Sequence, residues 1–164
     1  MVEDSLEVEI ARRLAEASET LSVVETSVGG LVSSRLTAIP GSSAWFLGGA
    51  AVYSATARLQ WLGLAPEPTR SAGVVSAETA LALARAGRDR LGATWGAAET
   101  GIAGPQTGRR STKPVGLGYV AVVGRAGDRE VERVEEVSTG LDDRGANREA
   151  FATALLGLLL ASLS

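Results

Sequence analysis

The sequence predicts a three-layer α/β/α domain with a mixed, mainly parallel sheet, and three observations point to it. Short apolar stretches alternate with segments of helical spacing over the first two-thirds of the chain, as parallel strands and their crossover helices do. A strand–turn–strand pattern follows, which adds an antiparallel hairpin. The 164 residues, of which 45% are hydrophobic and 21% charged, suffice for one core, and we expect a single domain over 1–164.

Hydrophobic spacing and capping residues define the expected elements of the first half. Apolar residues at helical spacing predict an opening amphipathic helix that contains Leu6, Ile10, Leu14 and Ala17. After it we expect, in order, a buried strand over 21–25, a helix over 31–37, a strand over 48–53, a helix that Ser54 caps and Gly63 ends, and a loop at Pro66 and Pro68.

In the second half, Ser76 is a good N-cap for a helix over about 77–90. The remaining expected elements are a strand over 94–100, a long loop over 101–114, two antiparallel strands over 115–124 and 130–138 around Gly127-Asp128, and a final helix over 146–162. The apolar part of the final helix is about half the length that spans a bilayer, so we expect it to be buried.

The composition excludes several kinds of chemistry. The chain has no cysteine and no histidine, so disulfides, thiolate chemistry and a Ser-His-Asp triad are ruled out, and the commonest zinc ligand is missing. The net charge of -3 and the scattered basic residues argue against a nucleic-acid partner. The acidic start lacks the pattern of a signal peptide, so we expect a cytoplasmic protein with no membrane partner.

Three segments combine the end of an expected strand with a loop of small and polar residues: 23–31, 98–105 and 139–148. In an open α/β sheet such loops meet beyond the carboxyl ends of the strands, where ligands bind. Gly29 and Gly30 at a helix start would present backbone N–H groups to an anion such as a phosphate, with Arg144 and Arg148 as countercharges. The alternatives are that the glycines only permit tight turns and that the arginines are solvated or ion-paired.

The stretch 39–49 places Ser42 and Ser43 between a Pro-Gly pair and two bulky aromatic residues. A serine in this position is either a helix cap, for which Ser42 is well suited, or a candidate nucleophile. A nucleophilic serine needs a base. In a chain without histidine the options are a carboxylate, a tyrosinate held by a cation, or Lys113, which is the only lysine.

Five stretches taken together resemble the C-terminal domain of the CinA (competence/damage-inducible) family, which includes stand-alone nicotinamide mononucleotide deamidases. In order, they read ETSVGGLVSSRLTAIPGSSAWFLGGAAVYSATAR, GVVSAETALALA, TGIAGP, KPVG and DRGANR. They keep the family's order and spacing from about residue 10 to the C-terminus. The resemblance implies a serine amidohydrolase that converts the carboxamide of nicotinamide mononucleotide, or of a related pyridine nucleotide, to a carboxylate and ammonia.

Carried over by position, the resemblance also implies the site residues. Ser43 would be the nucleophile and Tyr53 its supporting tyrosine, with Arg58 at the position of the base. The implied substrate-binding residues are Thr26, Ser27, Gly29, Gly30, Ser42, Thr100, Gly101, Lys113 and Arg144, the last near the phosphate. The resemblance implies no metal and no cofactor, a small-molecule nucleotide as ligand, and a homodimer or higher homo-oligomer.

Two motifs depart from the family pattern. In YSATAR, Arg58 stands where the family has the lysine that acts as base, and an arginine with a pKa above about 12 cannot readily accept the serine proton. Arg58 can still lower the pKa of Tyr53 or hold an anionic group of the substrate. In ETSVGG, Thr26 replaces the family's serine and Val28 its usual threonine.

Three functions are compatible with these residues. The first is an amidohydrolase with a rearranged base, either Lys113 or Tyr53 beside Arg58. The second is a catalytically inactive nucleotide-binding or regulatory protein. The third is an enzyme of the same fold that acts on another nucleotide-derived substrate, since the loop with Arg109 and Arg110 is more basic than the family's and suits a different anion.

Overall fold

The computed structural model describes residues 5–65, 73–106 and 111–163. Its elements are, in order, α1 (Leu6–Ala17), β1 (Leu21–Glu25), α2 (Leu31–Thr37), the 3-10 turn η1 (Ser42–Ala44), β2 (Phe46–Ala51), α3 (Ala55–Leu62), α5 (Ala77–Leu91), β3 (Trp95–Gly101), β4 (Leu117–Ala126), β5 (Arg129–Ser138) and α6 (Arg144–Ser162).

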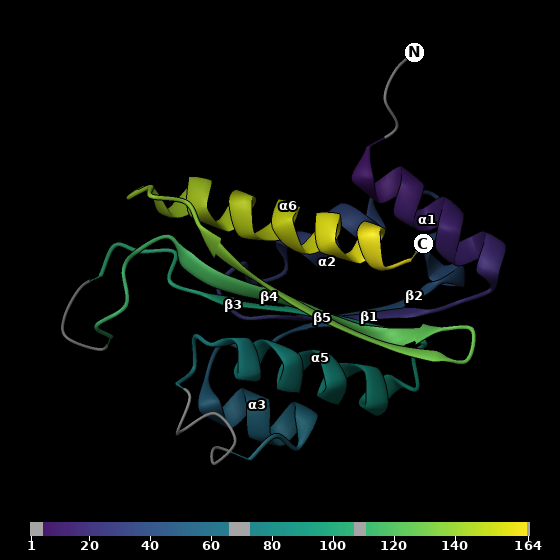
Figure 1. Ribbon diagram of the computed structural model, residues 1–164, viewed down its shortest axis with the longest axis horizontal. Helices are drawn as coiled ribbons and strands as arrows, with labels where there is room; N and C mark the ends of the chain where they lie inside the picture. Colours follow the sequence, from purple (N-terminus) through teal and green to yellow (C-terminus); the bar gives the residue numbers. More distant parts are fainter. Residues whose placement is uncertain (1–4, 66–72, 107–110, 164) are drawn as a thin grey trace.

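The five strands form one mixed sheet in the order β2-β1-β3-β4-β5. Strand β1 pairs in parallel with both β2 and β3, while β4 is antiparallel to β3 and to β5. Helices α1, α2 and α6 cover one face of the sheet and α3 and α5 cover the other (Figure 1). The predicted three-layer α/β/α architecture with a mixed sheet is therefore confirmed.

Each face of the sheet has its own apolar core. The larger core lies under α1, α2 and α6 and includes Ile10, Leu36, Trp95 and Phe151. The smaller one lies under α5 and contains Leu83 and small residues of the strands. Strands β1, β3 and β4 are buried almost throughout, and their sequences are mostly apolar without the alternation of a half-exposed strand.

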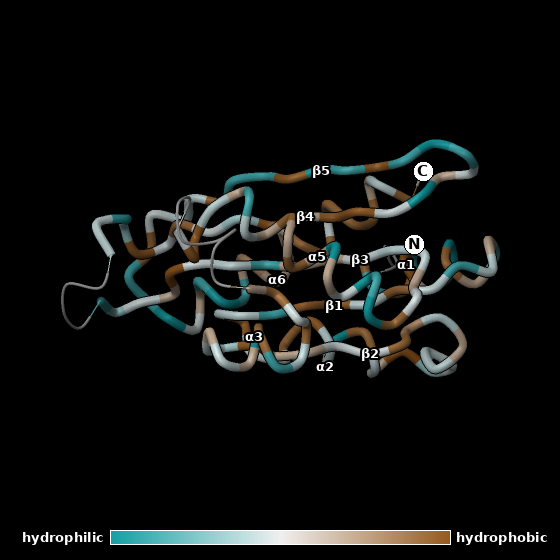
Figure 2. The backbone as a smooth tube through the Cα atoms, turned by 90° about the horizontal axis from the view of Figure 1, so that it is seen from below, coloured by the Kyte–Doolittle hydropathy of each residue, from teal (hydrophilic) through white to brown (hydrophobic). Residues whose placement is uncertain are grey.

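Strand β5 forms one edge of the sheet and is the most polar strand in Figure 2. None of its ten residues is fully buried. Charged side chains along an exposed edge discourage pairing with another chain, which is how many natural sheets protect such edges.

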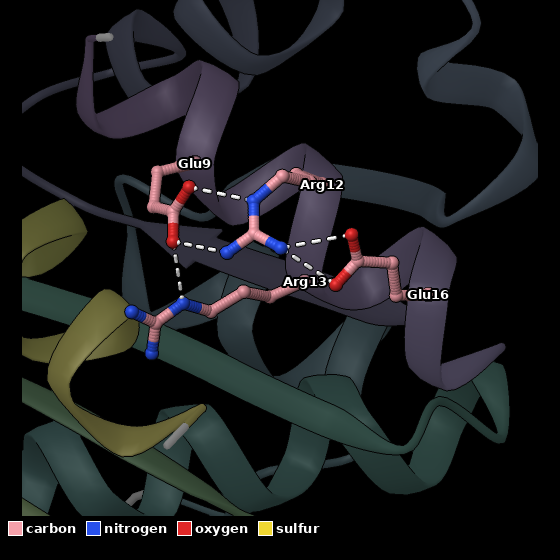
Figure 3. A network of polar contacts seen from close by, with 4 residues as sticks. All are labelled: Glu9, Arg12, Arg13 and Glu16. Carbon is pink, nitrogen blue, oxygen red and sulfur yellow. Dashed lines mark hydrogen bonds and ion pairs between the residues drawn. The ribbon is translucent and has the colours of Figure 1, made fainter. Parts of the chain in front are cut away.

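The outer surface of α1 carries a network of ion pairs (Figure 3). Arg12 bridges Glu9 and Glu16, at 2.6 and 2.7 Å, and Arg13 also binds Glu9 at 2.8 Å. The hydrogen bonds from Arg12 and Arg13 lower the pKa of the Glu9 carboxyl to about 2. Because Arg12 and Glu16 are exposed and Glu9 and Arg13 are only partly buried, the network contributes little to stability.

Most predicted elements are confirmed within one or two residues, including the caps Ser54 and Ser76 and the hairpin turn. The strand predicted over 48–53 begins earlier, at Phe46, because the buried Phe46 pairs with Leu21 at the start of β1. The prediction that Ser42 caps a helix is wrong, since Gly41 occupies the cap position of η1 without a side-chain hydrogen bond.

The buried final helix is also confirmed, because α6 packs Leu155, Leu156 and Leu159 into the larger core. No helix in the described part of the chain has the length and apolar character needed to span a bilayer. The predicted loop at Pro66 and Pro68 lies outside the described residues.

Candidate functional site

A cavity of about 670 Å³ lies at the carboxyl ends of the parallel strands. The loop after β3 and the starts of α5 and α6 gather at this same end of the molecule, on the left in Figure 1. Its described lining residues are Thr26, Ser27, Tyr53, Arg58, Gly73, Val74, Val75, Thr100, Gly101, Ile102, Ala103, Gly104, Pro105, Gln106, Ser111, Lys113 and Arg144.

Two buried glutamates, Glu25 and Glu99, hold the loop that follows β1, which carries the lining residues Thr26 and Ser27. Glu99 of β3 accepts hydrogen bonds from the backbone nitrogens of Thr26 (2.5 Å) and Val28 (3.0 Å) and from the hydroxyl of Ser27 (2.6 Å). Burial raises the pKa of the Glu99 carboxyl, and the charge of nearby Glu25 acts in the same direction, whereas the three donors lower it. Glu99 thus fixes the loop that carries Thr26 and Ser27.

Glu25 plays the same part for the start of α2. Its carboxylate accepts hydrogen bonds from the backbone nitrogens of Gly30 (2.8 Å), Val32 (3.1 Å) and Ser33 (2.9 Å) and from the Ser33 hydroxyl (2.6 Å). The positive end of the helix dipole is therefore neutralised by the protein's own anion.

This arrangement corrects the expectation that Gly29 and Gly30 offer their N–H groups to a ligand. The Gly30 nitrogen is already bound by Glu25, and neither glycine is among the residues that line the cavity. Their φ angles of 59° and 100° favour glycine, which supports the alternative that they permit a tight turn. Arg148 donates to the carbonyl of Val28 at 2.7 Å and so also serves this loop.

Two threonines line the cavity, Thr26 directly after β1 and Thr100 in the neighbouring β3. Thr26 Oγ1 donates to the carbonyl of Glu99 at 3.2 Å, and Thr100 Oγ1 donates to the carbonyl of Val74 at 2.8 Å. A hydroxyl that donates to a carbonyl keeps its oxygen lone pairs available, so both can accept a hydrogen bond from a ligand. Gly101 continues β3 into the lining.

Arg144 and Tyr53 meet at the mouth of the cavity. Arg144 donates to the Tyr53 hydroxyl at 3.2 Å and to the carbonyl of Gly104 at 2.7 Å. Tyr53 is 68% exposed, so this pair borders solvent. Arg144 is the first residue of α6, which Asp143 caps by accepting from the nitrogen of Ala146 at 2.7 Å. The charge of Arg144 remains available to a ligand because, among the described residues, its side chain binds only neutral groups.

Arg58 lies deeper, on α3, and is 8% exposed. Its guanidinium group makes no hydrogen bond or ion pair with any other residue that the structure describes, and burial lowers the pKa of that group. Lys113 also lines the cavity, and its amino group donates to the carbonyl of Val75 and lies 5.9 Å from the centroid of the Tyr119 ring.

The structure does not bring Ser42 and Ser43 to this cavity. Both lie in η1, directly before β2, whereas Tyr53 and Arg58 follow β2. The six residues of β2 separate the two groups by about 20 Å at 3.3 Å per residue. Within one chain, therefore, Ser43 does not lie next to Tyr53 and Arg58, because the intervening sequence is an extended strand and not a turn. The role of Ser43 as nucleophile stays a prediction.

The cavity does collect Thr26, Ser27, Tyr53, Arg58, Thr100, Gly101, Lys113 and Arg144 from the predicted set. Arg109 and Arg110 of the basic loop lie outside the described residues. Sequence reasoning missed the structural roles of Glu25 and Glu99. The available signal was a carboxylate at the end of each of two apolar strands, VVE and AAE, where an unpaired charge would be costly.

Comparison with known proteins places the chain in a family. The CinA C-terminal domain matches residues 3–163. A CinA-like protein of a Cyanothece species is 46% identical over 125 residues, which cover 76% of this chain and 30% of that protein. A CinA-like protein of Synechococcus elongatus is 42% identical over 139 residues, 85% of this chain and 33% of that protein. The chain thus spans about a third of the length of these relatives.

A solved structure agrees with the sequence matches. The crystal structure of competence/damage inducible protein CihA from Agrobacterium tumefaciens superimposes with a TM-score of 0.86 at 32% identity, covering 100% of this chain and 99% of that chain. The five-stranded mixed sheet and its helices are thus those of a known member. The chain belongs to the family of the CinA C-terminal domain.

Proposed function

We propose that this domain binds a pyridine mononucleotide of the nicotinamide mononucleotide type in the cavity, and that it lacks the general base needed to hydrolyse the carboxamide efficiently. The family resemblance supports the choice of ligand. The charge of the cavity also supports this ligand, because the described lining includes Arg58, Lys113 and Arg144 but no aspartate or glutamate. A phosphate-bearing ligand fits such a lining.

The observation that carries the second half of the proposal is Arg58. It lines the cavity at the position of the family's lysine, and a guanidinium group stays protonated at neutral pH. The candidate nucleophile Ser43 lies beyond the far end of β2. General-base assistance contributes about 10²–10⁴-fold to rate, so its loss leaves little turnover.

The test combines binding with product formation. The purified protein, incubated with nicotinamide mononucleotide, is expected to gain thermal stability by mass action and to release no ammonia above a protein-free blank. Arg58→Lys places a titratable amine at the same position, where it can take the proton of a hydroxyl that lines the cavity, such as that of Thr26, and is expected to raise ammonia release by at least about tenfold. Ammonia release by the unmodified protein at the rate of an efficient enzyme would contradict the proposal.

One observation favours a second candidate, a working amidohydrolase with a different base. Lys113 places an amino group in the cavity, and Tyr53 is held there by Arg144. In this version Lys113 or Tyr53 accepts the proton of a hydroxyl nucleophile such as that of Thr26. Ammonia release by the unmodified protein that disappears in Lys113→Ala or Tyr53→Phe would establish it.

A further inference from the structure

Arg58 is a buried cation that the described protein leaves without a countercharge. It is 8% exposed, and its guanidinium group has no hydrogen-bond or ion-pair partner among the described residues. Every fully buried side-chain nitrogen or oxygen in that part of the chain does have a partner. The guanidinium nitrogens of Arg58 therefore keep some accessible surface, and Arg58 is one of the residues that line the cavity.

The other polar groups of the cavity cannot neutralise this charge. The described lining contains no carboxylate, and its other two cations, Lys113 and Arg144, donate only to neutral oxygens. Glu25 and Glu99 lie nearby in the fold, but their oxygens are occupied by the 26–33 loop. An unpaired buried charge is strongly unfavourable, so an anion that enters the cavity relieves a cost already present in the free protein.

The cations occupy two different depths. Arg58 is buried on α3, whereas Arg144 borders solvent beside the exposed Tyr53. A cavity of about 670 Å³ has room for a ligand that reaches both. The ligand that matches this distribution has one anionic group at its buried end and another at the mouth.

We propose that the cavity selects a pyridine nucleotide whose ring carries a carboxylate, with the carboxylate bound by Arg58 and the phosphate near Arg144. The statement rests on the proposed function for the nucleotide part of the ligand. A carboxylate accepts two parallel N–H bonds from a guanidinium group. A carboxamide offers a single oxygen and turns its own N–H donors toward those of Arg58, so one side of the pair is left unmatched.

The experiment compares two probes that differ only at this group. Binding of nicotinate mononucleotide and of nicotinamide mononucleotide is measured by isothermal titration calorimetry on the full chain. The carboxylate compound is expected to bind about 10–100-fold more tightly, since a hydrogen-bonded charge is typically worth one to two powers of ten in affinity. In Arg58→Gln this preference is expected to fall to about twofold or less. Arg85→Gln, which removes an exposed arginine outside the cavity, serves as the matched control and should keep the preference.

The outcomes separate the two proposals. Equal or tighter binding of the carboxamide compound by the unmodified protein overturns the carboxylate preference and leaves the proposed pyridine-nucleotide function standing. Binding of neither probe overturns the proposed function itself. If a folded Arg58→Gln variant still binds the carboxylate compound more tightly, another residue binds the carboxylate. That result contradicts the proposed role of Arg58 in binding it. The comparison in the unmodified protein remains decisive even if this variant does not fold.

Discussion

The two ends of strand β2 differ in what the fold has built around them. At the amino end, Ser42 and Ser43 form a short 3-10 turn whose cap position holds only a glycine. At the carboxyl end, Tyr53 and Arg58 border a cavity whose neighbouring loop is fixed by the buried carboxylate of Glu99. Buried polar networks are costly to assemble, and this one lies beside the cavity and not beside the serines. This difference between the two ends is why we propose that the functional site lies at the carboxyl end.

Removing Glu99 is expected to give the largest difference in stability between variants at the two ends of β2. In Glu99→Ala the nitrogens of Thr26 and Val28 and the hydroxyl of Ser27 lose their acceptor. Each unsatisfied buried group costs about 1–3 kcal/mol, so the free energy of unfolding should fall by several kcal/mol. Urea denaturation followed by circular dichroism measures it. Ser43→Ala, the control at the other end of β2, should change stability little; an equal loss in both variants would contradict the contrast.

Ligand affinity gives the next largest effect. Arg144→Gln removes a cation at the mouth of the cavity, and we expect the affinity for nicotinamide mononucleotide to fall by about tenfold or more. Ser43→Ala should bind the nucleotide as the unmodified protein does, because Ser43 does not line the cavity. Calorimetric titration of both variants checks this. Weakened binding in Ser43→Ala with normal binding in Arg144→Gln would move the site to the amino end.

A smaller effect is expected on the pH dependence of the unfolding free energy, through Glu99 at the carboxyl end of the sheet. Burial raises the folded-state pKa of Glu99 above its ordinary value of 4.5. Its contribution to stability is therefore fully present below pH 4.5 and declines as the pH rises through the folded-state pKa. Glu99→Gln, which cannot ionise, should lose this decline and have a flatter profile of unfolding free energy above pH 4.5. An unchanged profile in the variant would show that Glu99 does not ionise over this range.

The smallest effect is expected on the surface network of α1, far from both ends of β2. The pKa of Glu9 is lowered to about 2 by its hydrogen bonds to Arg12 and Arg13. The contribution of Glu9 is thus present above pH 4.5 and lost as the pH falls toward 2. Arg12→Ala should leave the unfolding midpoint at neutral pH almost unchanged and weaken only this acid-side dependence. Thermal unfolding at pH 7 and pH 3 checks both statements.

Sequence reasoning predicted the fold well because its signals are local. Helical spacing around Ile10 and Leu14, the caps Ser54 and Ser76, and the apolar run of β1 each determine an element without help from distant residues. The start of β2 was missed because it depends on pairing with Leu21 of β1. Two residues that pair 25 positions apart cannot be recognised from the residues on either side of each.

The candidate site was predicted in part for the same reason. Thr26, Tyr53 and Thr100 each follow or end a parallel strand, so the topology brings them together at one edge. Ser43 is only ten residues from Tyr53, yet β2 lies between them and places them at opposite ends of that strand. The partner of the Gly30 nitrogen could not be predicted either, because a helix start that binds a ligand and one that binds an internal Glu25 have the same local sequence.

The measurement that tests this account most directly is amide hydrogen exchange of the full chain with and without nicotinamide mononucleotide. The account predicts slower exchange on binding in the segments that line the cavity, 26–28, 53–58 and 100–105, and no change in 41–45 around Ser43. Slower exchange confined to 41–45, with the cavity segments unaffected, would contradict the assignment of the site to the carboxyl end of the sheet.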